Sequence, residues 1–238
     1  MARAVRCHAI AVAVLAAFVM PSASVSAGGH GVFFETEYSD ASIEKEIPFN
    51  VGKVNRDFDG FMFGAGYLYD TNIATDNPLS YRIRLGYRIG KRNPDDKTTI
   101  RLANRLAQTD LDVGDTIAKV KSKTAQGVTL TQTIGYGFIR NETYRVWAGP
   151  TVRLNADWYG LATNIDVVDI AFGGGPEIGI NYHLNDRISL TSSIAYSVLY
   201  FAEHFESKGK DPTFKGYQHH VGLTFGVLWR NIDDQFGN

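Results

Sequence analysis

The stretch SYRIRLGYRIG, residues 80–90, decides the fold class, because apolar and polar side chains alternate along its whole length. One face collects its apolar side chains, namely Tyr81, Ile83, Leu85, Tyr87 and Ile89. The opposite face receives Ser, Arg and Gly. Successive side chains of a strand point to opposite faces, so this alternation predicts a β-strand with one apolar and one polar face.

The same period of two recurs along the chain and predicts seven further strands, in residues 31–38, 61–69, 128–138, 144–158, 168–184, 188–202 and 219–229. The connections between the eight strands are of two kinds. The longer, polar ones are 39–57, 91–126, 159–167 and 203–218, and the shorter ones are 71–79, 140–143 and 185–187. Long loops at one end and short turns at the other are typical of an outer-membrane barrel, with the short turns in the periplasm. The predicted fold class is therefore all-β, an eight-stranded antiparallel transmembrane β-barrel with long outer loops and short periplasmic turns.

One connection is ambiguous. TIRLANRLAQ, residues 99–108, fits both a short helix and a strand extension, because its apolar residues satisfy either period. We expect an ordered surface loop here, and a ten-stranded barrel is the alternative.

The apolar faces are expected to point outward, into lipid. The opposite faces are rich in Gly, Ser, Thr and charges, which suit the narrow interior of a small barrel. Aromatic residues also cluster near strand ends, as in interfacial girdles: Tyr81, Tyr144, Trp158, Tyr182, Tyr200 and Trp229. The alternative is a soluble, lipocalin-like barrel with the apolar faces turned inward.

The N-terminus predicts export. Arg3 and Arg6 precede an apolar run over residues 9–20, and small residues lead up to Ala27, so residues 1–27 are predicted to be a cleaved signal peptide. The barrel is assigned to residues 28–229, and residues 230–238 to a short periplasmic tail. The one cysteine, Cys7, lies in the signal peptide, so no disulfide, thiol catalysis or cysteine-ligated zinc is expected.

The charge balance excludes a basic nucleic-acid-binding protein, because 24 basic and 25 acidic residues leave a formal net charge of −1. On the outward-apolar interpretation, ten charged side chains point into the lumen: Glu35, Glu37, Arg82, Arg84, Arg88, Arg145, Arg153, Asp157, Asp169 and Glu177. Buried charges must be paired, because their desolvation is costly. Two interpretations stay open. An ion-pair network can fill the lumen and make the barrel a rigid anchor, or the same charges can line a narrow channel. Eight strands enclose little more than their own side chains, which favours the filled lumen.

Two Gly-Pro pairs interrupt neighbouring strands, at Gly149-Pro150 and Gly175-Pro176. Proline cannot donate to a β-ladder, so each pair predicts a bulge or bend. A device for wall curvature is the structural interpretation, and a local opening to lipid is the functional one.

The histidines do not form a convincing site. Only 203–207, Glu-His-Phe-Glu-Ser, brings His, acid and Ser together, and neighbours in a strand face opposite ways. The pair His219-His220 has the same difficulty as a metal site. We therefore expect no catalytic residue, no metal site and no cofactor.

The signal peptide, the strands YRIRLGYRIG and VGLTFGVLW and the alternating connection lengths together resemble the small outer-membrane β-barrel superfamily, which includes the membrane domain of OmpA and the OmpX and OmpW types. The resemblance covers residues 28–229. It implies a monomer in the outer membrane of a Gram-negative-type bacterium, with lipid and lipopolysaccharide as its surroundings. It also implies a structural or surface role, with any extracellular ligand bound at the outer loops. A narrow channel for small or hydrophobic solutes and a lipid A-modifying enzyme are the alternatives. Members often end on the aromatic residue that closes the last strand, whereas nine residues follow Trp229 here.

Overall fold

The computed structural model describes most of the chain downstream of the predicted signal peptide. The described residues are 28–47, 52–71, 73, 77–94, 99–100, 123–162, 165–206 and 213–230. In this part of the chain, no helix is long and apolar enough to cross a membrane. The predicted signal peptide lies outside the described residues and stays a prediction, as does the tail after Arg230.

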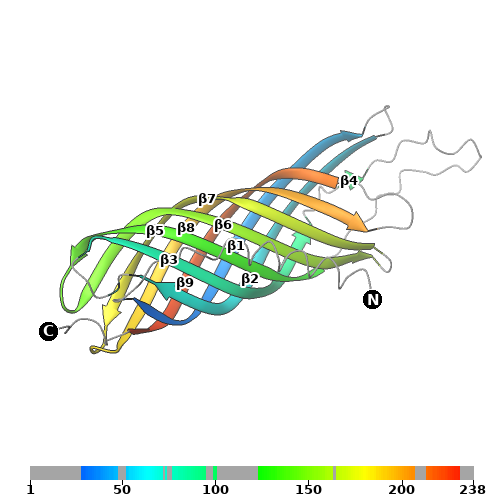
Figure 1. Ribbon diagram of the computed structural model, residues 1–238. Coiled ribbons are helices and arrows are strands. Elements are labelled where there is room, and N and C mark those ends of the chain that lie inside the picture. Colours follow the sequence, from blue (N-terminus) through cyan, green and yellow to red (C-terminus); the bar gives the residue numbers. More distant parts are fainter. Residues whose placement is uncertain are drawn as a thin grey trace, which may run out of the picture.

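The described elements are all strands: β1 (Gly29–Ile47), β2 (Gly52–Asp70), β3 (Leu79–Pro94), β4 (Thr99–Ile100), β5 (Lys123–Arg140), β6 (Tyr144–Ala162), β7 (Ile165–His183), β8 (Ile188–Glu206) and β9 (Thr213–Arg230). The eight long strands pair in the order β1-β9-β8-β7-β6-β5-β3-β2, and β2 pairs with β1 again. Every pairing is antiparallel, and the ring is closed. Figure 1 shows the strands wrapped obliquely around one barrel, with the turns at 141–143 and 184–187 together at its lower left end. The predicted eight-stranded antiparallel barrel is confirmed.

The strands are longer than their sequence pattern indicated. Most contain 18 or 19 residues, although about 9–11 tilted residues suffice to cross a membrane. Much of the predicted long loops 39–57, 91–126, 159–167 and 203–218 therefore belongs to strands. The physical reason is that, toward the outer end, apolar and polar side chains no longer alternate strictly between the two faces of a strand. Near the outer end Phe58 and Phe201 are buried in the lumen, while Asp40 and His204 face outward.

The segment 99–108 adds nothing to the barrel ring in its described part. Thr99–Ile100 forms the two-residue strand β4, which pairs only with Val54 and Asn55 of β2. The ten-stranded alternative is wrong for this reason. Residues 101–108 lie outside the described residues.

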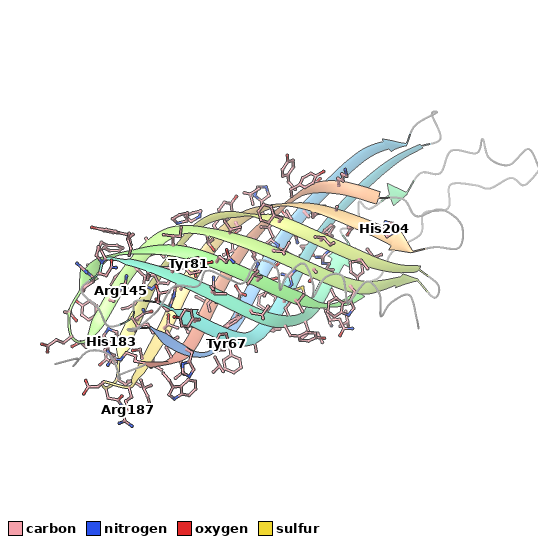
Figure 2. The ribbon with its side chains drawn as sticks, in the orientation of Figure 1. Tyr67, Tyr81, Arg145, His183, Arg187 and His204 are labelled. Atoms are coloured by element: carbon pink, nitrogen blue, oxygen red, sulfur yellow. The ribbon has the colours of Figure 1, made fainter. Side chains whose placement is uncertain are left out.

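Side-chain burial settles which face is inside. Many large apolar side chains on the outward faces are exposed, for example Phe34, Phe172 and Phe225 at 64, 54 and 51%, and others such as Ile83 are half-buried. By contrast, 28 polar and charged side chains of the described residues, nearly all on the inward faces, are buried at 5% exposure or less. Figure 2 shows Tyr67 and Tyr81 along the outward side of the wall. The lipocalin-like alternative required the reverse arrangement and is wrong.

The two described turns at the lower left end of Figure 1 have the same chemistry. Asn141 Oδ1 accepts the backbone N–H groups of Thr143 and Tyr144 at 2.9 and 2.8 Å. Asn185 Oδ1 accepts those of Arg187 and Ile188 at 2.9 and 2.8 Å. An Asn side chain that bonds the backbone two residues on replaces part of the missing ladder in a tight turn.

We expect Asn185→Ala to lower the free energy of unfolding by about 1–2 kcal/mol, because two backbone donors lose their acceptor in an exposed turn. Urea titration of the barrel in phospholipid vesicles, followed by Trp fluorescence, measures the loss. Asp186→Ala in the same turn is the control and should change stability by less than about 0.5 kcal/mol. Equal effects of the two variants would show that the Asn bonds contribute nothing.

The Gly-Pro pairs mark breaks in strand pairing. On β5–β6 the register runs from Thr133↔Thr151 directly to Tyr136↔Ala148. On β7–β8 it runs from Gly174↔Val198 directly to Glu177↔Ala195. The register is the same on both sides of each break, so neither Gly-Pro pair forms a bulge, and the bend that was predicted as the alternative stays a prediction. The irregularities of register lie elsewhere, at Gly137/Ile139 and Gly160/Ala162.

Candidate functional site: the charged lumen

Strand β3 supplies a row of cations to the lumen. Arg82, Arg84, Arg88 and Arg92 share one parity and are all buried. Gly86 interrupts the row where the ring of Phe33 reaches over from β1, and a Cβ at Gly86 would lie 2.7 Å from Phe33 Cζ. The inward face of one strand therefore directs four guanidinium groups toward the acids of the other strands.

The layer closest to the tight turns is built around Arg82. Its Nε lies 2.8 Å from Asp70 Oδ2, and its Nη2 donates to Asn181 Oδ1 and Thr191 Oγ1 at 3.1 and 2.8 Å. The guanidinium also stacks over the buried ring of Trp147, 4.2 Å from its centroid. Arg145 lies in the same end of the lumen and donates from Nη2 to the carbonyl of Pro78 at 2.8 Å.

The next layer surrounds the carboxylate of Glu177. Arg84 Nη2 lies 2.9 Å from its Oε1 and 3.0 Å from its Oε2. Thr133 Oγ1 and Ser193 Oγ donate to the same carboxylate at 2.6 and 2.7 Å. Protein donors therefore replace the water that this charge loses on burial.

The third layer joins three strands through two guanidinium groups. Arg153 donates to Glu35 at 2.9 Å and also to Glu37. Arg88 donates from Nε to Asp157 Oδ1 at 2.8 Å, and its Nη1 contacts Glu37. Glu37 thus links Arg88 of β3 to Arg153 of β6.

The outermost layer collects acids around Arg92. Its Nη2 donates to Asp157 and Asp169, each at 2.7 Å, and its Nη1 lies 3.7 Å from Glu203. The guanidinium lies between the rings of Phe58 and Tyr159, with centroid distances of 5.1 and 5.3 Å. Close to these charges a cluster of buried apolar side chains also fills the lumen: Ala41, Phe58, Ala171, Leu199 and Phe201.

The structure places all ten sequence-predicted charges inside the barrel, none more than 4% exposed. Three further charges lie with them and complete what we call the lumen network: Asp70, Arg92 and Glu203. Extending the alternation of each strand by one or two steps would have found all three. They were missed because they lie where the strands had been ended too early.

The histidines do not assemble a site. His204 is exposed while its neighbour Glu203 is buried and accepts a hydrogen bond from Tyr159 Oη at 2.5 Å. Figure 2 shows His204 at the end of the barrel opposite His183 and Arg187. His219 faces outward and stacks on Tyr196, whereas His220 is buried in the lumen. Among the described residues no group of three or more His, Cys, Asp or Glu could hold a metal ion.

The chain forms a closed barrel with a charged interior and an apolar exterior. Its sequence also matches a known protein family. The family model for the outer membrane protein beta-barrel domain matches residues 9–225. The chain belongs to this family. An outer-membrane barrel meets lipid on its outward face, which agrees with the exposed apolar side chains described above.

Solved outer-membrane barrels resemble the chain in fold at low identity. The outer membrane protein OprG from Pseudomonas aeruginosa is 10% identical, with a TM-score of 0.53, and the match covers 85% of this chain and 95% of that one. Neisserial surface protein A is 18% identical with a TM-score of 0.42, covering 85% and 97% of the two chains. The outer membrane protein AlkL is 12% identical with a TM-score of 0.48, covering 90% and 94%. No curated protein matches the chain. The likeness to OprG supports the barrel fold, and any activity must be argued from the residues themselves.

Proposed function

We propose that this outer-membrane barrel is a closed, rigid anchor with a structural or surface-binding role, and that it is not an enzyme. The observation that carries the proposal is the lumen network, in which six arginines and seven carboxylates of the described residues are each at most 4% exposed. Almost all of their surface is covered by other protein atoms, which leaves little room for ions or polar solutes to pass beside them.

The network also ties distant parts of the wall together. Arg84 of β3 pairs with Glu177 of β7, and Arg153 of β6 pairs with Glu35 of β1. Opening a pore through these layers would separate buried ion pairs. Leaving one such charge without its partner costs about 3–5 kcal/mol. A closed lumen is the low-energy state of this barrel.

With the lumen closed, any binding role belongs to the outer surface of the barrel. The strands continue beyond the length that crosses a membrane, so their outer ends can raise a binding surface above it. A polar extracellular ligand at this end, outer-membrane lipid and lipopolysaccharide around the wall, and a monomeric state complete the proposal.

A passive channel for small or hydrophobic solutes is the second candidate. Two observations favour it: the cluster of buried apolar side chains in the lumen, and the breaks in pairing beside Pro150 and Pro176. A lipid A-modifying enzyme has less support, because Glu203 and His204 lie on opposite faces of their strand.

Planar-bilayer recording of the purified mature barrel separates the anchor from the channel. We expect no reproducible unitary conductance at a protein concentration at which a general porin inserts and conducts. A stable conductance whose ion selectivity changes in Arg84→Met would contradict the anchor role and support the channel.

A further inference from the structure

The lipid-facing wall contains a groove of about 760 Å³ that is lined mainly by apolar residues, and Glu177 is the one member of the lumen network in its lining. It crosses β6, β7 and β8 and reaches Val221 of β9. Its lining includes Gly149, Pro150, Gly175, Pro176 and Tyr196. A volume of this size lies within the range of sites that hold small ligands.

The two Gly-Pro pairs create the groove. Pro150 of β6 lies directly opposite Pro176 of β7 in the register. Each proline removes a ladder donor, and the pairing is broken on both outer flanks, toward β5 and toward β8. The outward side chains here are Ala148, Pro150 and Pro176, which are shorter than the Ile, Phe and Tyr side chains on the rest of the wall, so the outward surface is depressed.

The groove lies at the middle of the apolar belt. On β6 it is centred between Tyr144 and Trp158, the two aromatic residues expected at the membrane interfaces. Its rim consists of outward apolar side chains, including Ile178 and Ile194, which are 47% and 50% exposed. Water at this depth would have few polar partners, so the groove must be filled by something apolar.

We propose that the groove is a binding site for one acyl chain of a phospholipid from the periplasmic leaflet. A second barrel is a poor occupant, because its wall is convex and would need a projecting side chain to fill a depression. A flexible hydrocarbon chain conforms to the depression and gains the dispersion contacts that an empty groove would lose.

The charges below the groove favour a zwitterionic phospholipid as the source of the chain. The turn between β5 and β6 follows Arg140 and contains Glu142, and the turn between β7 and β8 contains Asp186 and Arg187. All four residues are exposed. Glu142, Asp186 and Arg187 lie in turns that lead into strands of the groove, and Arg140 ends the neighbouring strand β5. The phosphate and amine of phosphatidylethanolamine match this mixture of cations and anions.

The test maps lipid contacts on the intact barrel. The mature chain is reconstituted in vesicles of phosphatidylethanolamine and phosphatidylglycerol that contain phosphatidylethanolamine with a diazirine near the end of one acyl chain. After illumination, mass spectrometry locates the adducts. We expect residues 148–150 and 176–178 to be labelled roughly tenfold more than Ile83, a difference that corresponds to one specific site rather than uniform lipid contact.

The matched variants are Ala148→Phe and Ile83→Phe. Ala148 and Ile83 are both half-buried and face outward. Each is the fifth residue of a strand that begins at the tight-turn end of the barrel, but only Ala148 lines the groove. Ala148→Phe should reduce labelling of the groove to the level of the rest of the wall, and Ile83→Phe should leave it unchanged. If Ala148→Phe does not fold, the smaller Ala148→Leu replaces it.

Three results would overturn the proposal. Labelling spread evenly around the wall would mean that the groove holds no specific chain. Cross-linked dimers with little lipid labelling at the groove would make a second copy the occupant. Labelling that disappears only when lipopolysaccharide is added would assign the chain to the outer leaflet.

Discussion

Replacing Arg88 by methionine should lower the free energy of unfolding of the barrel by about 3–5 kcal/mol. Arg88 is 2% exposed, bonds Asp157 through two nitrogens and also contacts Glu37. Methionine fills part of the same volume but leaves the two carboxylates with fewer donors in a desolvated place. Removal of one partner from a buried pair is costly because the other charge stays buried without compensation.

Equilibrium urea titration in vesicles, read by Trp fluorescence and by the mobility shift between heated and unheated samples on gels, measures this loss. Lys91→Met is the control on the same strand, because Lys91 is exposed and should change stability by less than about 0.5 kcal/mol. Adding Glu37→Gln to Arg88→Met should recover part of the loss, because it removes one carboxylate that has lost a donor. A loss below about 1 kcal/mol in Arg88→Met would mean that water reaches these charges, and the lumen would have to be regarded as open.

The sequence could predict those parts of the fold in which the two faces of a strand differ in chemistry. The alternation in residues 80–90 and its seven repeats located eight strands because lipid outside and polar packing inside demand opposite side chains. Toward the outer ends of the strands that difference fades. Phe58 and Phe201 are buried in the lumen there, and Asp40 and His204 face outward. Neither a local period nor the composition then distinguishes a strand from a loop.

The sequence allowed us to predict which charged residues point into the lumen, but not which of them form ion pairs with one another. Parity alone assigned Arg82, Arg84 and Arg88 to the interior, and one more step along the same strand reaches Arg92. The partner of Arg88 is Asp157, 69 residues away. That contact depends on the stagger between strands that are not neighbours, and no local pattern encodes this stagger. The position of Pro150 opposite Pro176 depends on register in the same way.

The second large effect is expected on the outward face, where Val152→Arg should destabilise the barrel by about 2–4 kcal/mol. Val152 is 47% exposed and lies near the middle of β6, between Tyr144 and Trp158. A guanidinium at this depth must leave water for hydrocarbon or distort the lipid around it. On the surface of a soluble barrel, the same substitution would be nearly neutral.

Urea titration in vesicles measures this effect against Asn93→Arg, an exposed position near the outer end of β3 whose cross-strand neighbour is Asp59. Because Asn93 lies beyond the apolar belt and opposite an acid, Asn93→Arg should stay within about 0.5 kcal/mol of the wild type. Both variants introduce the same cation on the same face of the wall. The difference between their losses of stability therefore measures the effect of depth in the membrane. If Val152→Arg and Asn93→Arg were equally mild, the apolar belt could not be the part of this protein that contacts lipid. The anchor role and the acyl-chain site would then both lose their basis, because each requires hydrocarbon at the level of Val152.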